Sequence, residues 1–351
     1  MEPSVLTGPS YVIWDITYAC PLRCVHCYSE SGRRPSRQLE FDDLLKIADA
    51  LIALRPAQLA FSGGEPMSVP GLTLLASRIR EAGIETALYT SGWALTPDAA
   101  WRLMNVFSEI HVSVDGADAA THDRIRGRAG SYDRAMAALA ALNKEADLRY
   151  TAGQPPFRFG IDSVVMRGNF DGLERFCRDV LPRFPMLHTV LFGAVVPSGL
   201  ASREGFSRHE LLSEEQVERL TSPAFRALLG GMAPSTVDVQ TSSNRELQMH
   251  PDLIADGMVF PAMQVEPDGE VRAMPIYEGT VGNLLTESPD GLWRRSVERW
   301  SDPFVTSVLS GARTWPEWAE ATRKIDEHFG NERVRARIAA RPAYADPGHD
   351  G

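Results

Sequence analysis

The chain has 351 residues, which is long enough for one large α/β domain, or for a domain plus an appendage, with an ample core. Its hydrophobic fraction of 44% and charged fraction of 23% are ordinary, and its net charge of −10 argues against nonspecific nucleic-acid binding and mildly favours a cationic or neutral substrate. The sequence shows no secretory signal and no apolar stretch near the roughly 20 residues that span a bilayer, so we expect a cytoplasmic protein without membrane or nucleic-acid partners.

Strand-like and helix-like runs alternate from residue 11 to residue 199. The first strand, YVIWDIT at 11–17, leads directly into a group of cysteines. The predicted strands that follow are 57–66, 84–92, 109–116, 157–166 and 187–199. The predicted helices between them are 41–54, 72–83, 96–107, 131–145 and 170–181. Six such alternations predict a parallel sheet covered by helices.

Polar and glycine residues gather where the predicted strands end. These groups are Ser62, Gly63, Gly64 and Glu65; Thr90, Ser91 and Gly92; Ser113, Asp115 and Gly116; and Pro197 and Gly199. In parallel α/β architectures, binding groups lie outside the carboxyl ends of the strands. We therefore expect all these turns, and the cysteines after the first strand, to share one rim around a single pocket mouth.

Three of the four cysteines, Cys20, Cys24 and Cys27, have a C-x3-C-x2-C spacing. Thiols of a cytoplasmic protein are reduced, so this group indicates a metal or catalytic site rather than disulfides. Thiolates favour zinc or iron–sulfur clusters, and a structural zinc site needs a fourth ligand that His26, next to Cys27, would have to fold back to supply. Three cysteines leave one iron of a four-iron cluster without a protein ligand, which is the open position that a catalytic metal requires. A zinc loop would explain the cysteines but not the rest of the rim.

The segment CPLRCVHC at 20–27 resembles the signature of the radical S-adenosylmethionine (SAM) superfamily, with His26 at its usual aromatic position. SGGEP at 62–66 and HVSVDG at 111–116 resemble two further motifs of that family, and THDRIRGRAGSYDRAM at 121–136 resembles the stretch that commonly follows them. The resemblance covers about residues 11–200. It implies a partial (β/α)6 barrel and one [4Fe–4S] cluster on the three cysteines, with the open iron chelated by the amino and carboxylate groups of SAM.

The resemblance also implies a set of cofactor-binding residues. We expect Gly63 and Gly64 to let backbone approach the ligand, Glu65 to accept from the amino group of SAM, and Arg126 to fork onto its carboxylate. Hydroxyl and ribose contacts are expected from Ser113 and Asp115, with Ser163 and Asn169 near the ribose. Ser91 stands where the family more often has asparagine, and it could be a simple turn residue, as could Ser163 and Asn169. The full expected set is His26, Ser62, Gly63, Gly64, Glu65, Ser91, Ser113, Asp115, Arg126, Ser163 and Asn169.

The C-terminal part of the chain has a fainter resemblance. Residues 259–288 resemble the SPASM-type extension of radical SAM enzymes, which normally carries cysteines for auxiliary clusters. Here Ala262 and Met274 stand near two of the expected cysteine positions, and no cysteine follows Cys177. We therefore predict a radical SAM core at 1–200 and a SPASM-like α+β extension at 201–351 that caps the pocket without holding a cluster. Cys177 falls on the predicted helix 170–181 and is expected to be a buried, inert thiol.

By this resemblance the protein would cleave SAM reductively to a 5′-deoxyadenosyl radical, with an electron from a flavodoxin or ferredoxin type of reductant, and abstract hydrogen from a substrate. We expect the substrate to be a small polar natural-product intermediate of amino-sugar or nucleoside type. Because ligands for a second cluster are lacking, a redox-neutral outcome is expected: epimerisation, decarboxylation, elimination or rearrangement.

Two alternatives stay open. The first is a maturase of a ribosomally made peptide, similar to the mycofactocin type. Many such enzymes have a separate leader-binding module, for which we expect no room before a strand that begins at residue 11. The second is a non-catalytic iron–sulfur protein, which would need the cysteines but not Glu65, Asp115 and Arg126.

Overall fold

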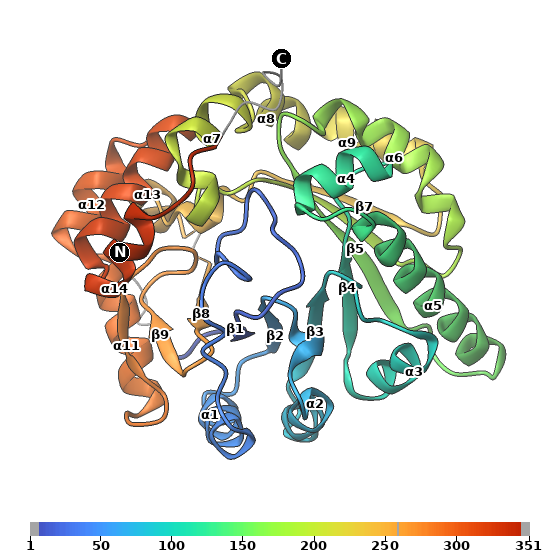
Figure 1. Cartoon of the computed structure of the whole chain (residues 1–351), viewed down its shortest axis with the longest axis horizontal. Coiled ribbons are helices and arrows are strands. Elements are labelled where there is room, and N and C mark those ends of the chain that lie inside the picture. Colours follow the sequence, from blue (N-terminus) through green and yellow to red (C-terminus); the bar gives the residue numbers. More distant parts are fainter. Residues whose placement is uncertain (1–6, 258–259, 345–351) are drawn as a thin grey trace.

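The computed structural model describes residues 7–257 and 260–344, and its centre is one curved sheet with helices around it (Figure 1). The sheet has ten strands in the order β10-β9-β8-β1-β2-β3-β4-β5-β6-β7. The first six are β1 Tyr11–Thr17, β2 Gln58–Gly63, β3 Glu85–Thr90, β4 Glu109–Ser113, β5 Arg158–Val165 and β6 Thr189–Ala194. Each of them pairs in parallel with the next. The predicted six-stranded parallel core is therefore confirmed.

The helices that connect these strands follow the predicted order. They are α1 Phe41–Ala53, α2 Leu72–Glu81, α3 Pro97–Val106, α5 Ser131–Thr151 and α6 Leu173–Asp179. Local signals set their ends: Thr96 caps α3 by accepting from the Ala99 amide at 3.2 Å, and Pro97 occupies the first helical position. One further helix, α4 Ala119–Arg126, was missed by the sequence reading because it is short and mostly polar.

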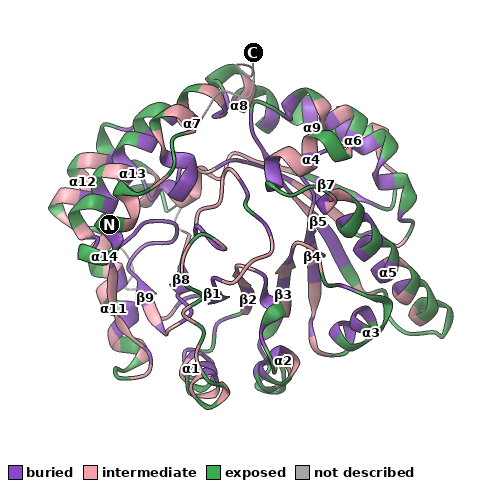
Figure 2. Ribbon diagram, viewed as in Figure 1, coloured by how far each residue is buried: buried purple, intermediate pink, exposed green. Residues whose placement is uncertain are grey.

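The two faces of the sheet differ in burial. On β4, Ile110 and Val112 are buried and pack toward α5, whereas Glu109, His111 and Ser113 stay partly exposed on the concave face. Strands β1, β5 and β6 show the same alternation over part of their length. Figure 2 shows burial along the strands and exposure on the outer surfaces of the helices. Solvent therefore reaches a concave face that carries polar side chains.

The C-terminal part extends the same sheet at both edges. Strand β7 Asp238–Ser242 pairs in parallel with β6, and β8 Ala262–Val265 pairs in parallel with β1. Strands β9 Glu270–Arg272 and β10 Thr280–Asn283 add on in antiparallel fashion beyond β8. The helices of this part are α7 Glu204–His209, α8 Glu214–Thr221, α9 Pro223–Met232, α10 Pro251–Ala255, α11 Pro289–Trp300, α12 Pro303–Ser310, α13 Trp315–Phe329 and α14 Glu332–Ala339.

The predicted fold class, a partial barrel with an α+β extension, is confirmed. The boundary near residue 200 falls in the 3₁₀ turn Gly199–Ser202 and stays a prediction, since strands from both sides share one sheet. Within the described ranges, no helix combines the length and the apolar character needed to cross a membrane.

Candidate active site

The three clustered cysteines lie on the segment 18–32 that follows β1, which we call the cysteine loop. Figure 1 shows this dark-blue segment near the middle of the view, beside the strands. Backbone hydrogen bonds tie it to the end of α4: the Arg23 amide donates to the Arg126 carbonyl at 3.0 Å, and the Val25 amide to the Ile125 carbonyl at 2.9 Å. The helix that the sequence reading missed is therefore the element that supports this loop.

The sulfur atoms of the three cysteines do not converge on one point. The sulfurs of Cys20, Cys24 and Cys27 are not all within 4.8 Å of one another. A tetrahedral zinc with bonds of about 2.3 Å would hold its sulfurs only about 3.8 Å apart. Burial raises the pKa of Cys20 to about 12 and that of Cys24 to about 11, so metal ligation would displace their protons. The donor set and its spacing fit a polynuclear iron–sulfur cluster.

A buried ion pair stands beside Cys24. Arg126 donates through Nη2 to the Asp115 carboxylate at 2.8 Å, and its Nη1 lies 3.9 Å from Cys24 Sγ. His26 Nε2 lies 3.2 Å from the other carboxylate oxygen of Asp115. Burial alone would raise the pKa of Asp115, but Arg126 and then His26 lower it well below its usual range. Arg126 is thus paired with Asp115, whereas the sequence predicted that it would bind the SAM carboxylate.

Asn169 is fully occupied by backbone groups. Its amide nitrogen donates to the carbonyls of Asp115 at 2.8 Å and Val164 at 2.9 Å, and its oxygen accepts from the Met166 amide at 2.8 Å. Asn169 thereby holds the ends of β4 and β5 together. The ribose contact expected of it stays a prediction.

The two glycines of SGGEP pack closely against the backbone at the end of β1 and the start of the cysteine loop. A Cβ on Gly63, which has φ of +109°, would lie 2.6 Å from the Thr17 carbonyl oxygen, and one on Gly64 would lie 2.1 Å from that of Ala19. These residues let the turn after β2 pack directly against the start of the cysteine loop.

Glu65, the next residue, is buried and already hydrogen-bonded. Its carboxylate accepts from the Thr90 hydroxyl at 2.7 Å, from the Ser91 amide at 3.0 Å and from the Met67 amide at 3.2 Å, and also from the Ser91 hydroxyl. The serine that replaces the more usual asparagine is therefore a partner of Glu65. A cationic ligand would have to share Glu65 with these donors.

The three other predicted serines lie in different surroundings. Ser62 lies on β2 with its hydroxyl 3.5 Å from that of Tyr28, and Ser113 is half-buried on the concave face. Ser163 is buried, and its hydroxyl has no hydrogen-bond partner. It lines a pocket of about 170 Å³ together with Asp115 and Asn169. An orphaned buried hydroxyl beside a pocket fits a polar ligand group.

The sequence reading missed Asp15. This residue accepts from the Tyr28 hydroxyl at 2.6 Å and from the Gln264 amide at 2.8 Å, and so joins β1, the cysteine loop and β8. Burial raises its pKa to about 6, against the lowering effect of Arg272. A lone aspartate in the apolar run YVIWDIT was the signal that could have identified it.

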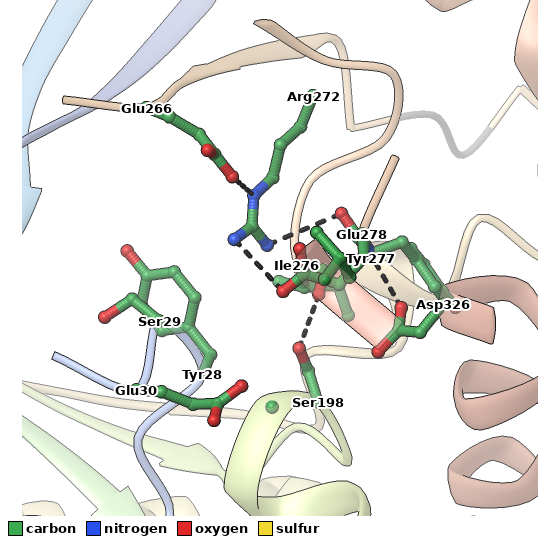
Figure 3. Close-up of polar contacts among 12 residues, drawn as sticks. Tyr28, Ser29, Glu30, Ser198, Glu266, Arg272, Ile276, Tyr277, Glu278 and Asp326 are labelled. Atoms are coloured by element: carbon green, nitrogen blue, oxygen red, sulfur yellow. Dashed lines mark hydrogen bonds and ion pairs between the residues drawn. The ribbon is translucent and has the colours of Figure 1, made fainter. Parts of the chain in front are cut away.

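The far end of the cysteine loop is held by arginines. Glu30 has a φ of +53° and is buried, and its carboxylate oxygen Oε1 lies 3.1 Å from Arg337 Nε and 2.9 Å from Arg341 Nη2. Beside it, Arg272 lies between Glu266 at 2.9 Å and Glu278 at 3.4 Å (Figure 3). The extension thus contacts the cysteine loop through buried ion pairs. Cys177, by contrast, is buried on α6, as expected.

Comparison with known proteins identifies a family that the first half of the chain resembles. Residues 14–150 match the family model of the radical SAM superfamily. The chain is 31% identical over 174 residues to the AdoMet-dependent heme synthase of Methanosarcina barkeri, covering 49% of this chain and 47% of that protein. It is 33% identical over 172 residues to a mycofactocin maturase of Mycolicibacterium smegmatis, covering 49% and 41%. The chain therefore spans about half the length, or less, of these two relatives.

Two further similarities extend over most of the chain. It is 28% identical over 347 residues to the PqqA peptide cyclase of Ruegeria pomeroyi, covering 97% of this chain and 87% of that protein. The structure of Streptococcus suis SuiB bound to S-adenosylmethionine superposes with a TM-score of 0.65 at 14% identity, covering 89% of this chain and 70% of that one, which shows a shared fold.

The matched segment, residues 14–150, is similar to the radical SAM superfamily and contains the three clustered cysteines. A [4Fe–4S] cluster and S-adenosylmethionine are the cofactors of that superfamily.

Proposed function

We propose that this chain holds one [4Fe–4S] cluster on Cys20, Cys24 and Cys27 and uses SAM to remove a hydrogen atom from a substrate on the concave face of the barrel. The observation that carries the proposal is the cysteine loop, which places three thiols in one segment after β1, beside the buried ion pair of Asp115 and Arg126. When bound, the reduced cluster and SAM supply a 5′-deoxyadenosyl radical. The protein residues around the bound ligands determine which hydrogen atom of the substrate this radical reaches.

Several of the chain's own residues hold together the turns around the proposed site. Arg126 places positive charge next to Cys24 Sγ, which favours the thiolate that a metal needs. Glu65 joins the turns after β2 and β3, and Asp15 joins β1 to the cysteine loop and to the extension. Strand β8, paired with β1, brings the extension to the edge of the core.

Two of the relatives, unlike the heme synthase, favour a peptide substrate. The alignment with the PqqA peptide cyclase includes the extension, and the mycofactocin maturase aligns with half of this chain. We therefore propose a ribosomally made peptide as the leading substrate. The small polar natural-product intermediate expected from the sequence is the competing candidate, and the acidic balance of the chain favours a substrate with a positive or neutral charge in either case.

A protease test separates the two substrates. Reduced enzyme with SAM is incubated with a heated extract of the source cells, and formation of 5′-deoxyadenosine is measured above the rate without extract. We expect the extract to stimulate this formation, and digestion of the extract with proteinase K, later inactivated, to abolish the stimulation. Stimulation that survives digestion and passes a low-molecular-weight filter would contradict the peptide and favour the small metabolite.

A further inference from the structure

One carboxylate on the concave face has no partner. Asp162 lies on β5, in register with Ser113 of β4 and Leu191 of β6. Its chain neighbours Ile161 and Ser163 are buried on the opposite face of the strand, so Asp162 faces the same side as the partly exposed residues of β4. Its own side chain is also partly exposed, so solvent and ligands can reach it from the concave side.

Other charged groups on this face are paired. Glu109 accepts from Gln58 at 2.6 Å, lies 3.4 Å from Arg158 and lies 3.6 Å from His111. His111 also stacks on Tyr89, with ring centroids 4.9 Å apart. These contacts leave no cation of β4 or β5 committed to Asp162.

Asp162 differs, since its carboxylate makes no hydrogen bond or ion pair with any residue in the described part of the chain. Burial raises its pKa, while the more distant charges of His111 and then Arg126 lower it. A carboxylate that is partly shielded from water and has no partner is less well stabilised than a free one, and a ligand cation would offset that loss.

The position of Asp162 is close to the site. The charges of Arg126, Asp115 and His26, which stand beside Cys24, all act on it. Arg126 itself is committed to Asp115, so it cannot neutralise Asp162 directly. A group held at Asp162 would therefore be bound on the face where the proposed chemistry takes place.

We propose that Asp162 binds an ammonium group of the substrate. Amino-acid side chains of a peptide and amino sugars both carry such a group, and a carboxylate–ammonium pair is a charge-assisted hydrogen bond. The inference rests on the proposed function and adds to it the charge of the substrate.

The test uses full-length reconstituted enzyme, reduced with dithionite, with SAM and either perdeuterated n-butylammonium or perdeuterated n-butanol at equal concentration. In the reaction one electron from dithionite breaks the C–S bond of SAM, methionine leaves, and a C–D bond of the probe breaks. The deuterium moves to the 5′-carbon of 5′-deoxyadenosine, and the unpaired electron stays on the probe. Mass spectrometry of 5′-deoxyadenosine then reports whether the probe was held beside the reacting carbon.

We expect deuterium from the ammonium probe, and about tenfold less from butanol. Asp162→Asn should lower labelling by the ammonium probe to the butanol level, and Asp162→Glu should restore part of it. Glu109→Gln is the matched control, because that carboxylate lies on the same face but is already paired, and it should label like wild type. Deuterated lysine in a tripeptide and deuterated glucosamine then distinguish the two sources of the amine.

Equal labelling by both probes, unchanged labelling in Asp162→Asn, or no labelling by either probe while 5′-deoxyadenosine forms would each overturn the inference. The comparison of probes in the wild type decides even where Asp162→Asn fails to fold. If the wild type forms no 5′-deoxyadenosine at all, the proposed function fails, and this inference with it.

Discussion

At the scale of single residues, Glu65 joins three segments around the site. Its carboxylate accepts from donors on the turn after β3 and on its own turn, and it is buried. The turn that it belongs to packs against the start of the cysteine loop through Gly63 and Gly64. Loss of this carboxylate would leave buried donors without an acceptor, which costs about 1–3 kcal/mol for each group.

We predict that Glu65→Ala weakens SAM binding by about tenfold, or ~1.4 kcal/mol, and leaves the iron content unchanged, because the carboxylate orders the turns and touches no thiol. Equilibrium dialysis with SAM and iron analysis measure the two effects. Glu81→Ala, which removes an exposed carboxylate at the end of α2, is the control. SAM affinity equal to that of wild type would show that this turn is not part of the SAM site.

Single-residue roles were harder to predict than the elements that carry them. The sequence placed His26, Asp115 and Arg126 at one site, and the structure brings these three together beside Cys24. It could not predict that Arg126 pairs with Asp115, because that contact depends on how α4 returns against the cysteine loop. The hydrogen bonds from Asn169 to backbone carbonyls could not be predicted either, because they also depend on how distant segments pack together.

At the scale of elements, helix α14 holds the cysteine loop. Its arginine Arg337, with Arg341 just beyond it, binds Glu30, which lies three residues after Cys27 and whose amide donates to the Cys27 carbonyl at 3.4 Å. A positive φ is unfavourable for a residue other than glycine, so neighbours must hold Glu30 in it. Removing one partner of a buried ion pair typically costs about 3–5 kcal/mol.

We predict that Glu30→Gln, and Arg337→Gln combined with Arg341→Gln, each speed the loss of iron to a chelator by about tenfold. Combining all three substitutions should add little to the effect of the arginine pair, which already removes the Glu30 contact together with the ion pair of Arg337 and Glu278. Arg333→Gln on the exposed side of α14 should behave like wild type. Chelation is followed by absorbance under anaerobic conditions, with circular dichroism to verify folding. Equal rates in all variants would show that α14 does not hold the loop.

Local signals account for why the elements could be predicted. Apolar periodicity, the Thr96 cap and glycine ends fixed the alternation up to β6, since these features act within a few residues. The pairing of β8 with β1 joins segments some 250 residues apart, as the register Tyr11↔Ala262 shows, and no local pattern encodes it.

At the scale of the whole molecule, core and extension share one sheet, and buried hydrogen bonds join them. Gln264 of β8 reaches Asp15 of β1, and Ser198 donates to the Ile276 carbonyl at 2.5 Å. The extension holds no cysteine, so the chain lacks thiolates for an auxiliary cluster. The redox-neutral outcome expected on this ground stays a prediction.

The central claim is that one cluster on the cysteine loop drives SAM cleavage. The most direct measurement is the formation of 5′-deoxyadenosine and methionine by anaerobically reconstituted, reduced protein, alongside its iron and sulfide content. We predict about four iron atoms and four sulfides per chain, with cleavage in wild type and in Cys177→Ala, whose thiol is buried on α6, and no cleavage in Cys24→Ala. Cleavage that persists in Cys24→Ala, or zinc as the tightly held metal, would contradict the account.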